Sequence, residues 1–207
     1  QGGTNDGSVV MVHNAAQERR FVLANVSMSS YFGMADSPDG RYVLLSIESP
    51  VTLPDIYALP LSGGPAVPVA SGPGSEASPG FSPDGRFVAY ASNESGRPQV
   101  YVVAFPANGG KWQVSQEGGT EPRWSRDGKE LFYVDRENWI VSVELGASAA
   151  GFAPGATHRL FQFHSIGGDW RYDVSPDGTR FLVAAPPDDA TQDPITLVTN
   201  WTARLAK

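Results

Sequence analysis

Short apolar runs alternate with turn-forming residues along most of the chain. Residues 41–47, 55–61, 86–92 and 99–105 are rich in apolar side chains, and Gly, Pro, Asp or Asn stands near their ends. Runs of this length that contain β-branched and aromatic residues and are bounded by turn formers predict strands. The pattern therefore predicts an all-β chain.

One unit recurs four times in this pattern. Ser-Pro-Asp-Gly occupies 37–40, 82–85 and 175–178, and Ser-Arg-Asp-Gly occupies 125–128. Pro fixes φ, Asp bonds the nearby backbone and Gly accepts positive φ, so each unit predicts a tight turn into a strand. The units begin 43 to 50 residues apart. This period predicts a β-propeller of four-stranded antiparallel blades.

The aspartates and glycines of these units are interpreted as structural. An array of carboxylate ligands is the alternative, but a ring holds one such turn per blade, far from the next, and capping of the backbone is the ordinary role of such aspartates. The residues concerned are Asp39, Gly40, Asp84, Gly85, Asp127, Gly128, Asp177 and Gly178.

The whole chain, residues 1–207, is predicted to be one propeller domain, with two extra strands within 9–24. The last blade lacks a fourth strand, and an unpaired blade edge invites association with other chains. The strands within 9–24 either complete that blade or belong to a partial blade, and a homo-oligomer through unpaired edges is a further alternative. The blades are expected at about 31–70, 78–115, 121–162 and 170–201.

Charge and composition exclude several classes of partner and site. The formal charge of −7 argues against nucleic acid as the partner. The chain has no cysteine, which excludes disulfides, thiol nucleophiles and Cys-ligated zinc. The sequence has no run of 18 apolar residues, so no membrane span is predicted.

Catalytic and metal motifs are also absent from the sequence. The three histidines, His13, His158 and His164, do not have the spacing of a helical metal motif, and no Gly-x-Ser-x-Gly nucleophile elbow occurs. The acidic run of Asp188, Asp189 and Asp193 lacks the glycine and the spacing of a calcium loop. We therefore expect no catalytic residue, no metal and no cofactor.

The residues around the turns resemble a known repeat. Residues 81–90 (Phe-Ser-Pro-Asp-Gly-Arg-Phe-Val-Ala-Tyr) and 122–134 (Pro-Arg-Trp-Ser-Arg-Asp-Gly-Lys-Glu-Leu-Phe-Tyr-Val) resemble the WD40-like PD40 repeat of TolB-type propellers. The tail at 193–202 resembles the end of the propellers joined to bacterial, eukaryotic-like Ser/Thr protein kinases. These resemblances imply a bacterial, extracytoplasmic or periplasmic sensor or binding module. A kinase Gly-rich loop and a His-Arg-Asp run are absent from this chain.

Blade topology assigns the charged loops to opposite rims of the ring. Alternating strand directions put the Asp-Gly turns on a lower rim and the loops between blades on an upper rim. The lower turns carry the basic residues Arg41, Arg86, Lys111, Arg126, Lys129 and Arg180. Against Arg97 and Arg136, the upper loops carry eleven acidic residues: Glu48, Glu76, Glu94, Glu117, Glu121, Asp135, Glu137, Asp169, Asp188, Asp189 and Asp193. An acidic upper face favours a basic protein or peptide, a polyamine or a cation, although acidic loops also serve solubility.

A protein or small-ligand site is expected at the upper mouth of the channel, where loops from several blades converge. The alternative is that Glu121 pairs with Arg123 and Asp169 with Arg171, since charges in a narrow channel need partners. The binding residues predicted are Tyr31, Phe32, Glu121, Arg123, Asp169, Trp170 and Arg171.

Three functions are compatible with this sequence. The first is a non-enzymatic module that recognises a protein or ligand. The second is an accessory propeller of a larger hydrolase or peptidase, and the third is a TolB-like envelope scaffold that docks a partner protein. Propellers host unrelated functions, so the fold does not choose among these.

Overall fold

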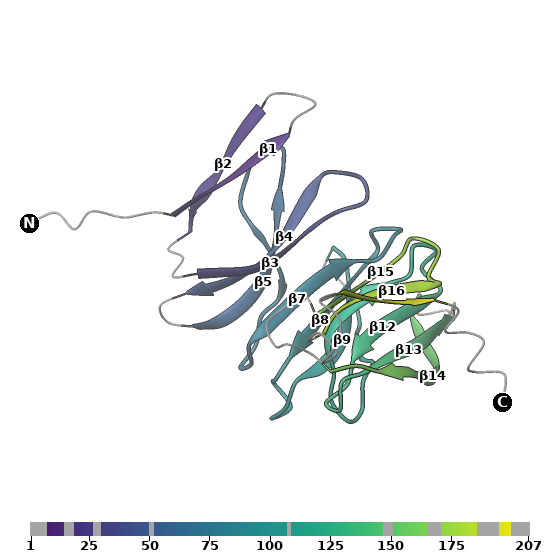
Figure 1. Cartoon of the computed structure of the whole chain (residues 1–207). Helices are drawn as coiled ribbons and strands as arrows, with labels where there is room; N and C mark the ends of the chain where they lie inside the picture. The colour runs from purple at the N-terminus through teal and green to yellow at the C-terminus, as the bar shows by residue number, and fades with distance from the viewer. Residues whose placement is uncertain are drawn as a thin grey trace, which may run out of the picture.

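The computed structural model describes residues 8–14, 19–26, 30–49, 52–106, 109–146, 151–164, 171–185 and 195–199. Every regular element within these ranges is a β-strand, and the strands form a series of antiparallel sheets (Figure 1). The prediction of an all-β fold built from antiparallel blades is confirmed.

Three sheets have four strands each, in chain order from the inner to the outer strand. Blade one contains β3 (Ser30–Asp36), β4 (Tyr42–Ser49), β5 (Thr52–Pro60) and β6 (Val67–Ala70). Blade two contains β7 (Glu76–Phe81), β8 (Phe87–Ser92), β9 (Gln99–Ala104) and β10 (Lys111–Gln113). Blade three contains β11 (Thr120–Trp124), β12 (Glu130–Val134), β13 (Trp139–Gly146) and β14 (Ala153–Gln162).

The first and last sheets are smaller. Blade four contains β15 (Tyr172–Val174), β16 (Arg180–Ala184) and β17 (Ile195–Thr199), while β1 (Ser8–Asn14) and β2 (Arg19–Val26) form a separate two-stranded sheet. In Figure 1 the purple β1–β2 hairpin lies far from β15 and β16. Among the described strands, β1 and β2 pair with each other and with no strand of blade four, and their assignment to a blade stays a prediction.

The core lies between the blades because successive side chains of a strand point to opposite faces of its sheet. In β8, Val88 and Tyr90 join a cluster shared with blade one, whereas Phe87 and Ala89 join a cluster shared with blade three. A third cluster joins blades three and four around Phe132, which is fully buried. Blades two and three are therefore apolar on both faces.

The turns at the lower rim share one hydrogen-bond pattern. In blade two, Ser82 Oγ donates to Asp84 Oδ1 at 2.6 Å, and the same oxygen accepts from the backbone N of Arg86 at 3.0 Å. Phe87 N donates to Ser82 Oγ at 3.0 Å, which ties the turn to the start of β8. The corresponding atoms make the same bonds in the other three blades.

These hydrogen bonds favour the charged form of the carboxylates. The hydroxyl of Ser37 and the backbone N of Arg41 lower the pKa of Asp39 to about 2. Ser175 and the backbone N of Thr179 likewise lower the pKa of Asp177 to about 2. In each turn one carboxylate oxygen of the aspartate accepts the hydrogen bonds that cap the backbone. Each aspartate therefore has a structural role whether or not a ligand binds.

Substitution of Gly85 tests whether the turn needs a residue that accepts positive φ. Its φ is 71°, and a Cβ there would lie 3.7 Å from Pro38 Cδ, which is an ordinary contact. Gly85→Val should therefore lower the free energy of unfolding through backbone strain alone, by about 1–2 kcal/mol. Gly85→Asn should cost less, because Asn tolerates the left-handed region. Urea denaturation measures both variants, and equal stability of the Gly85→Val and Gly85→Asn proteins would contradict the argument.

Candidate functional site

The upper rim is the end of the sheets opposite the Asp-Gly turns. It carries the connections between blades and the loops between second and third strands, including 71–75, 93–98, 114–119 and 135–138. Each junction between two blades presents a different group of polar side chains on this rim. The three junctions are the places where a ligand could contact two blades at once.

A buried ion pair joins blades three and four. Arg171 Nε contacts Glu121 Oε1, and the backbone N of Arg171 donates to Glu121 Oε2 at 2.7 Å. The remaining guanidinium nitrogens donate to Asn138 Oδ1 at 2.9 Å and Thr120 Oγ1 at 2.8 Å. Tyr172 donates its hydroxyl to the backbone O of Glu121 at 2.9 Å. The group is hydrogen-bonded within the protein and cross-links the two blades.

Arg123 takes a different part in this junction from the one expected. Its Nη1 donates to the backbone O of Pro122 at 2.9 Å, and its Cζ lies 5.8 Å from the centroid of the Tyr172 ring. Glu121 forms an ion pair with Arg171, whereas the alternative drawn from the sequence pairs Glu121 with Arg123. Glu121 and Arg171 thus help to hold two blades together, and ligand binding by the predicted residues stays a prediction.

Of the other predicted binding residues, the structure describes at most the backbone. The backbones of Tyr31 and Phe32 belong to β3, the inner strand of blade one, and their side chains lie outside the described part. Asp169 and Trp170 lie outside the described residues. The predicted mouth is thus represented by Glu121, Arg123 and Arg171.

Two buried carboxyl groups meet between blades one and two. Glu76 is only 2% exposed, and its Oε1 accepts a hydrogen bond from Ser92 Oγ at 2.9 Å. Burial raises the pKa of Glu76, and the adjacent Asp55 and Glu94 raise it further, against the opposing effect of Ser92. Glu76 Oε2 is buried and has no hydrogen-bond partner among the described residues. Burial and the neighbouring carboxyls therefore make the neutral form of Glu76 more favourable here than in water.

An open cleft of about 440 Å³ lies between blades two and three. Its apolar lining consists of Val114, Tyr133 and Val141, and burial raises the pKa of the Tyr133 hydroxyl to about 12. The polar lining consists of Gln116, Glu117, Asp135, Glu137, Thr157 and Arg159. Three carboxylates thus face one guanidinium in the cleft.

The carboxylates of this cleft differ in how far they are already engaged. Asp135 Oδ1 accepts from the backbone N of Glu137 at 2.8 Å and of Trp139 at 3.0 Å, and its Oδ2 lies 2.8 Å from Arg159 Nη2. Arg159 Nη1 lies 3.2 Å from Glu137 Oε2. Glu117 is exposed and forms no ion pair with any side chain in the described ranges. Glu117 is therefore the carboxylate most available to a ligand.

Cations on strands offset part of the acidic charge expected on the upper rim. The sequence assigns Lys111 to the lower rim, but its Nζ lies 2.5 Å from Oε1 of Glu94 in an upper loop and 4.5 Å from the Tyr101 ring centroid. Arg159 and Arg171 also reach acidic loop residues. The prediction of an acidic upper rim counts only the charges of loop residues. It leaves out the long basic side chains that extend along the sheet toward that rim. Acidic charge is in excess in the cleft between blades two and three.

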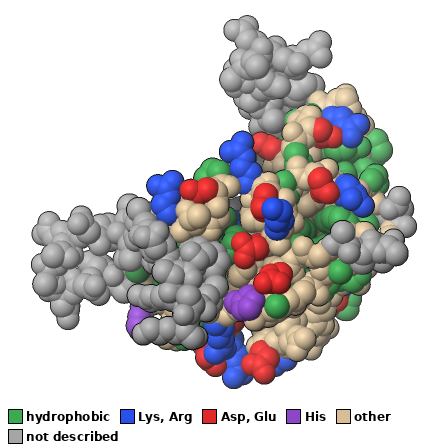
Figure 2. Space-filling model, turned by 90° about the vertical axis from the view of Figure 1, so that its right-hand side faces the viewer, with side chains coloured by type: hydrophobic (Ala, Val, Ile, Leu, Met, Phe, Trp, Pro, Cys, Tyr) green, Lys and Arg blue, Asp and Glu red, His purple; other side chains and the backbone are tan. Residues whose placement is uncertain are grey.

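The face over the C-terminal blades has no large area of one sign. Figure 2 shows acidic and basic side chains interspersed on it, with hydrophobic side chains between them. Among the residues described, no group of three His, Asp or Glu side chains is arranged to hold a metal ion. The same residues contain no helix long and apolar enough to cross a membrane.

Comparison with known proteins identifies the repeat and the fold. A family model described as the TolB beta propeller domain (PD40) matches residues 4–153. No curated protein sequence matches the chain. Among solved structures, TolB from Acinetobacter baumannii superposes with a TM-score of 0.66 at 17% identity, over 92% of this chain and 46% of that one.

Other solved structures of the same fold differ in what they are. A putative TolB from Agrobacterium tumefaciens matches with a TM-score of 0.64 at 19% identity, over 89% of this chain and 67% of that one. An oligogalacturonate lyase in complex with manganese matches with a TM-score of 0.64 at 15% identity, over 89% of this chain and 52% of that one. The chain spans about half the length of the first TolB and of the lyase. Identities at this level show a shared fold.

The ion pair between Glu121 and Arg171 leads to a prediction on stability. Arg171→Met leaves a buried carboxylate without its partner, and it should cost about 3–5 kcal/mol of unfolding free energy. Adding Glu121→Gln removes that charge and should restore part of the loss. Urea denaturation of the single and double variants measures this coupling. A double variant no more stable than Arg171→Met would show that the pair is not the stabilising contact.

The carboxyl pair leads to a prediction on pH. The folded pKa of Glu76 is raised, so its contribution to stability is present below its ordinary pKa of 4.5 and is lost as pH rises through the raised value. Glu76→Gln removes the titrating group and keeps the shape of the side chain, so its stability relative to wild type should increase as the pH rises across that window. The matched control is Glu117→Gln, an exposed carboxyl on the same rim. Parallel curves of stability against pH for wild type and Glu76→Gln would contradict a raised pKa of Glu76.

Proposed function

This chain belongs to the TolB beta-propeller domain family, and we propose that it works as a non-enzymatic binding module. The proposed ligand is a basic segment of a partner polypeptide, and the proposed site is the cleft between blades two and three. The function rests on the site, because family membership assigns the fold and leaves the ligand open.

One observation carries the proposal. The cleft is lined by Glu117, Asp135 and Glu137 and by one cation, Arg159, while Arg136 outside the lining lies 3.8 Å from Glu137, so acidic charge remains in excess by one. An excess of negative charge in a hollowed surface attracts cations and repels anionic partners. The volume of about 440 Å³ is within the range of ordinary ligand sites, and apolar side chains line part of it. A lysine or arginine has both the apolar stem and the charged end that such a lining requires.

The location of the cleft also favours a polypeptide as the ligand. It lies on a rim formed by loops from two blades, with Gln116 and Gly118 on one side and Glu137 and Thr157 on the other. A partner chain laid across the rim could contact both sides while placing one basic side chain in the cleft. We place this module outside the cytoplasm, as the resemblance to TolB-type propellers implies.

A second candidate is an accessory propeller within a larger enzyme. It is favoured by the presence of an oligogalacturonate lyase among the structural neighbours, of which this chain covers 52%. In that case the cleft would position a substrate for a site built elsewhere. Catalysis by the purified chain would contradict the binding function, whereas catalysis that requires an added domain would favour this candidate.

The experiment uses a fluorescein-labelled decalysine peptide as the probe and decaglutamate as its charge-matched control. Fluorescence polarisation should show saturable binding of decalysine only. Glu117→Gln with Glu137→Gln should weaken binding about tenfold, since two attractive charges are removed. Glu144→Gln is the matched control, because its exposed carboxylate lies on β13 outside the cleft.

Two outcomes would contradict the proposal. The first is no binding of decalysine at low salt, where attraction between exposed charges is strongest. The second is an equal loss of affinity in the Glu144→Gln protein, which would show attraction to net charge alone. Circular dichroism and melting curves of each variant separate loss of the site from loss of the fold.

A further inference from the structure

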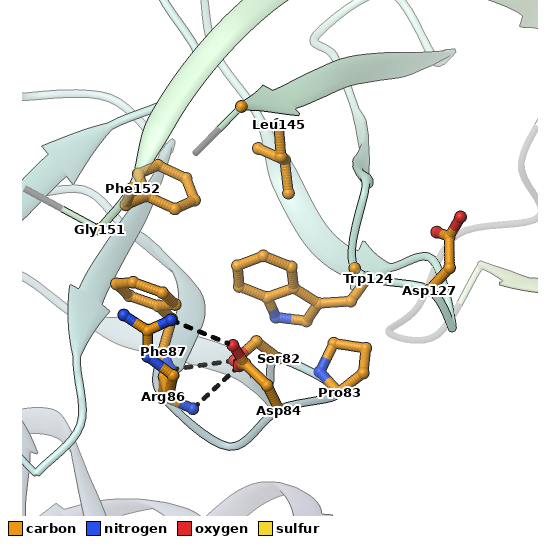
Figure 3. A pocket seen from close by; sticks show the side chains of 12 residues that line it. Ser82, Pro83, Asp84, Arg86, Phe87, Trp124, Asp127, Leu145, Gly151 and Phe152 are labelled. Carbon is orange, nitrogen blue, oxygen red and sulfur yellow. Dashed lines mark hydrogen bonds and ion pairs between the residues drawn. The ribbon is translucent and has the colours of Figure 1, made fainter. Parts of the chain in front are cut away.

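A second pocket lies at the lower rim, between the Asp-Gly turns of blades two and three. It has a volume of about 390 Å³ and shares no lining residue with the cleft on the upper rim. Figure 3 shows the aromatic rings of Phe87, Trp124 and Phe152 around it, with Asp84 and Asp127 on different sides of the Trp124 indole. The sequence assigns the turns a structural role only, partly on the expectation that the turns of neighbouring blades lie far apart. That expectation is wrong, because a Cβ on Gly128 would lie only 3.7 Å from Pro83 Cδ.

The aromatic walls of this turn pocket are held in place by mutual contacts. Phe152 lies 5.4 Å from Phe87 and 6.2 Å from Trp124 between ring centroids, and Trp112 supports it from 5.3 Å. Trp124 Nε1 donates to the backbone O of Gly80 at 3.0 Å, which fixes the indole. The aromatic surface is thus formed before a ligand arrives, and little conformational entropy is lost on binding.

The two carboxylates that line the pocket are only partly engaged. In both turns Oδ1 accepts the capping hydrogen bonds. Asp84 Oδ2 lies 3.8 Å from Arg86 Nη1, and Asp127 Oδ2 lies 3.4 Å from Lys129 Nζ, with all four side chains more than half exposed. Exposed ion pairs at such distances contribute little free energy, so a ligand can compete for both oxygens.

A cation already rests against one wall of the pocket. Arg86 Cζ lies 5.4 Å from the centroid of the Phe87 ring, which is the geometry of a cation–π contact. The wall therefore accommodates a guanidinium group. Arg86 and Lys129 balance the charge of the two carboxylates, so the feature that favours a cationic ligand is the aromatic surface, with carboxylate oxygens held only by weak, exposed pairs beside it.

The sequence shows why the pocket forms at this junction. The residue directly before the serine of each turn is Asp36, Phe81, Trp124 or Val174. Trp124 places a large flat surface between the turns of blades two and three. At the equivalent place Phe81 packs instead against Phe105, 5.1 Å away, and Val174 packs into the core cluster between blades three and four.

We propose that the turn pocket binds a cationic side chain, arginine or lysine, of a partner polypeptide. The apolar stem lies against Phe87, Trp124 and Phe152, and the charged end lies within the field of Asp84 and Asp127. This site lies on the rim opposite the upper cleft and does not depend on it. The Asp-Gly turns of this junction then have two functions, since Oδ1 caps the backbone and Oδ2 faces the ligand.

The test is an NMR titration with N-acetyl-arginine amide as the probe and N-acetyl-leucine amide as its uncharged control. The indole N–H of Trp124 reports on this pocket specifically. It should shift saturably with the arginine probe and remain unchanged with the leucine probe. The expected dissociation constant is millimolar, because one side chain offers few contacts.

The fold itself supplies a matched control. Asp84→Asn with Asp127→Asn should weaken the binding of the arginine probe at least fivefold, while the amides keep an oxygen for the caps. Asp39→Asn with Asp177→Asn changes the same turn in blades that do not line the pocket and should leave affinity unchanged. Melting temperatures of both double variants show how much each pair contributes to the fold.

A further variant tests the proposal even if the aspartate variants of the turns do not fold. Leu145 lines the pocket, and Leu145→Lys should place an ammonium group there and abolish the shift of the Trp124 indole N–H. The proposal is overturned if the arginine probe gives no saturable shift, or if the leucine probe gives the same one. It is equally overturned if the Asp39/Asp177 control weakens binding as much as the Asp84/Asp127 variant.

Discussion

Packing between blades depends on one constraint, the alternation of side chains along the second strand of each blade. In β8 and β12 both faces are covered, so every position from Phe87 to Ser92 and from Leu131 to Val134 is buried. A strand of this kind has no face exposed to solvent, so a polar side chain on it loses hydration free energy unless it finds a hydrogen-bond partner. Polar groups are therefore concentrated at the rims, where strands end and loops begin.

This constraint explains why the three upper junctions contain such different polar groups. A carboxyl that reaches into a junction must be protonated, paired or left at an opening to water. Burial raises the pKa of Glu76, which favours its neutral form, Glu121 is paired with Arg171, and Glu117 lies exposed in the cleft. The ion pair holds two blades together, and the exposed carboxylate leaves charge for a partner. The candidate site is thus the junction at which the protein does not neutralise its own acidic side chains.

The repeat and the turn chemistry are readable from the sequence because both are local. The four Ser-x-Asp-Gly units specify the turn, the following strand and the period of the blades. The pairing of Glu121 with Arg171 cannot be predicted from the sequence, because the two residues are 50 positions apart and the distance between them depends on how two blades pack. The contact of Lys111 with Glu94 is not predictable for a similar reason, since the backbone of Lys111 lies at the lower end of the sheet while its long side chain meets a residue of an upper loop.

The turn pocket has one signal in the sequence. Trp124 stands where the other repeats have Asp36, Phe81 and Val174, and a tryptophan at an otherwise variable position of a repeat marks a local specialisation. Its partners Phe87 and Phe152 lie on different blades, so only the structure shows that the three rings enclose one space.

The same comparison between repeats bears on the outward face of blade four. Leu182 occupies the position of Leu44, Ala89 and Phe132, each of which is fully buried against the following blade. In blade four Leu182 is 48% exposed, while its neighbour Phe181, which faces blade three, is fully buried. Full burial of a leucine is worth about 1.5–3 kcal/mol, so the repeat places an apolar residue where a neighbouring sheet would stabilise the blade. Within the described ranges no sheet covers this face, since β1 and β2 pair only with each other. The outward face of blade four thus exposes an apolar side chain at a position that the other three blades bury.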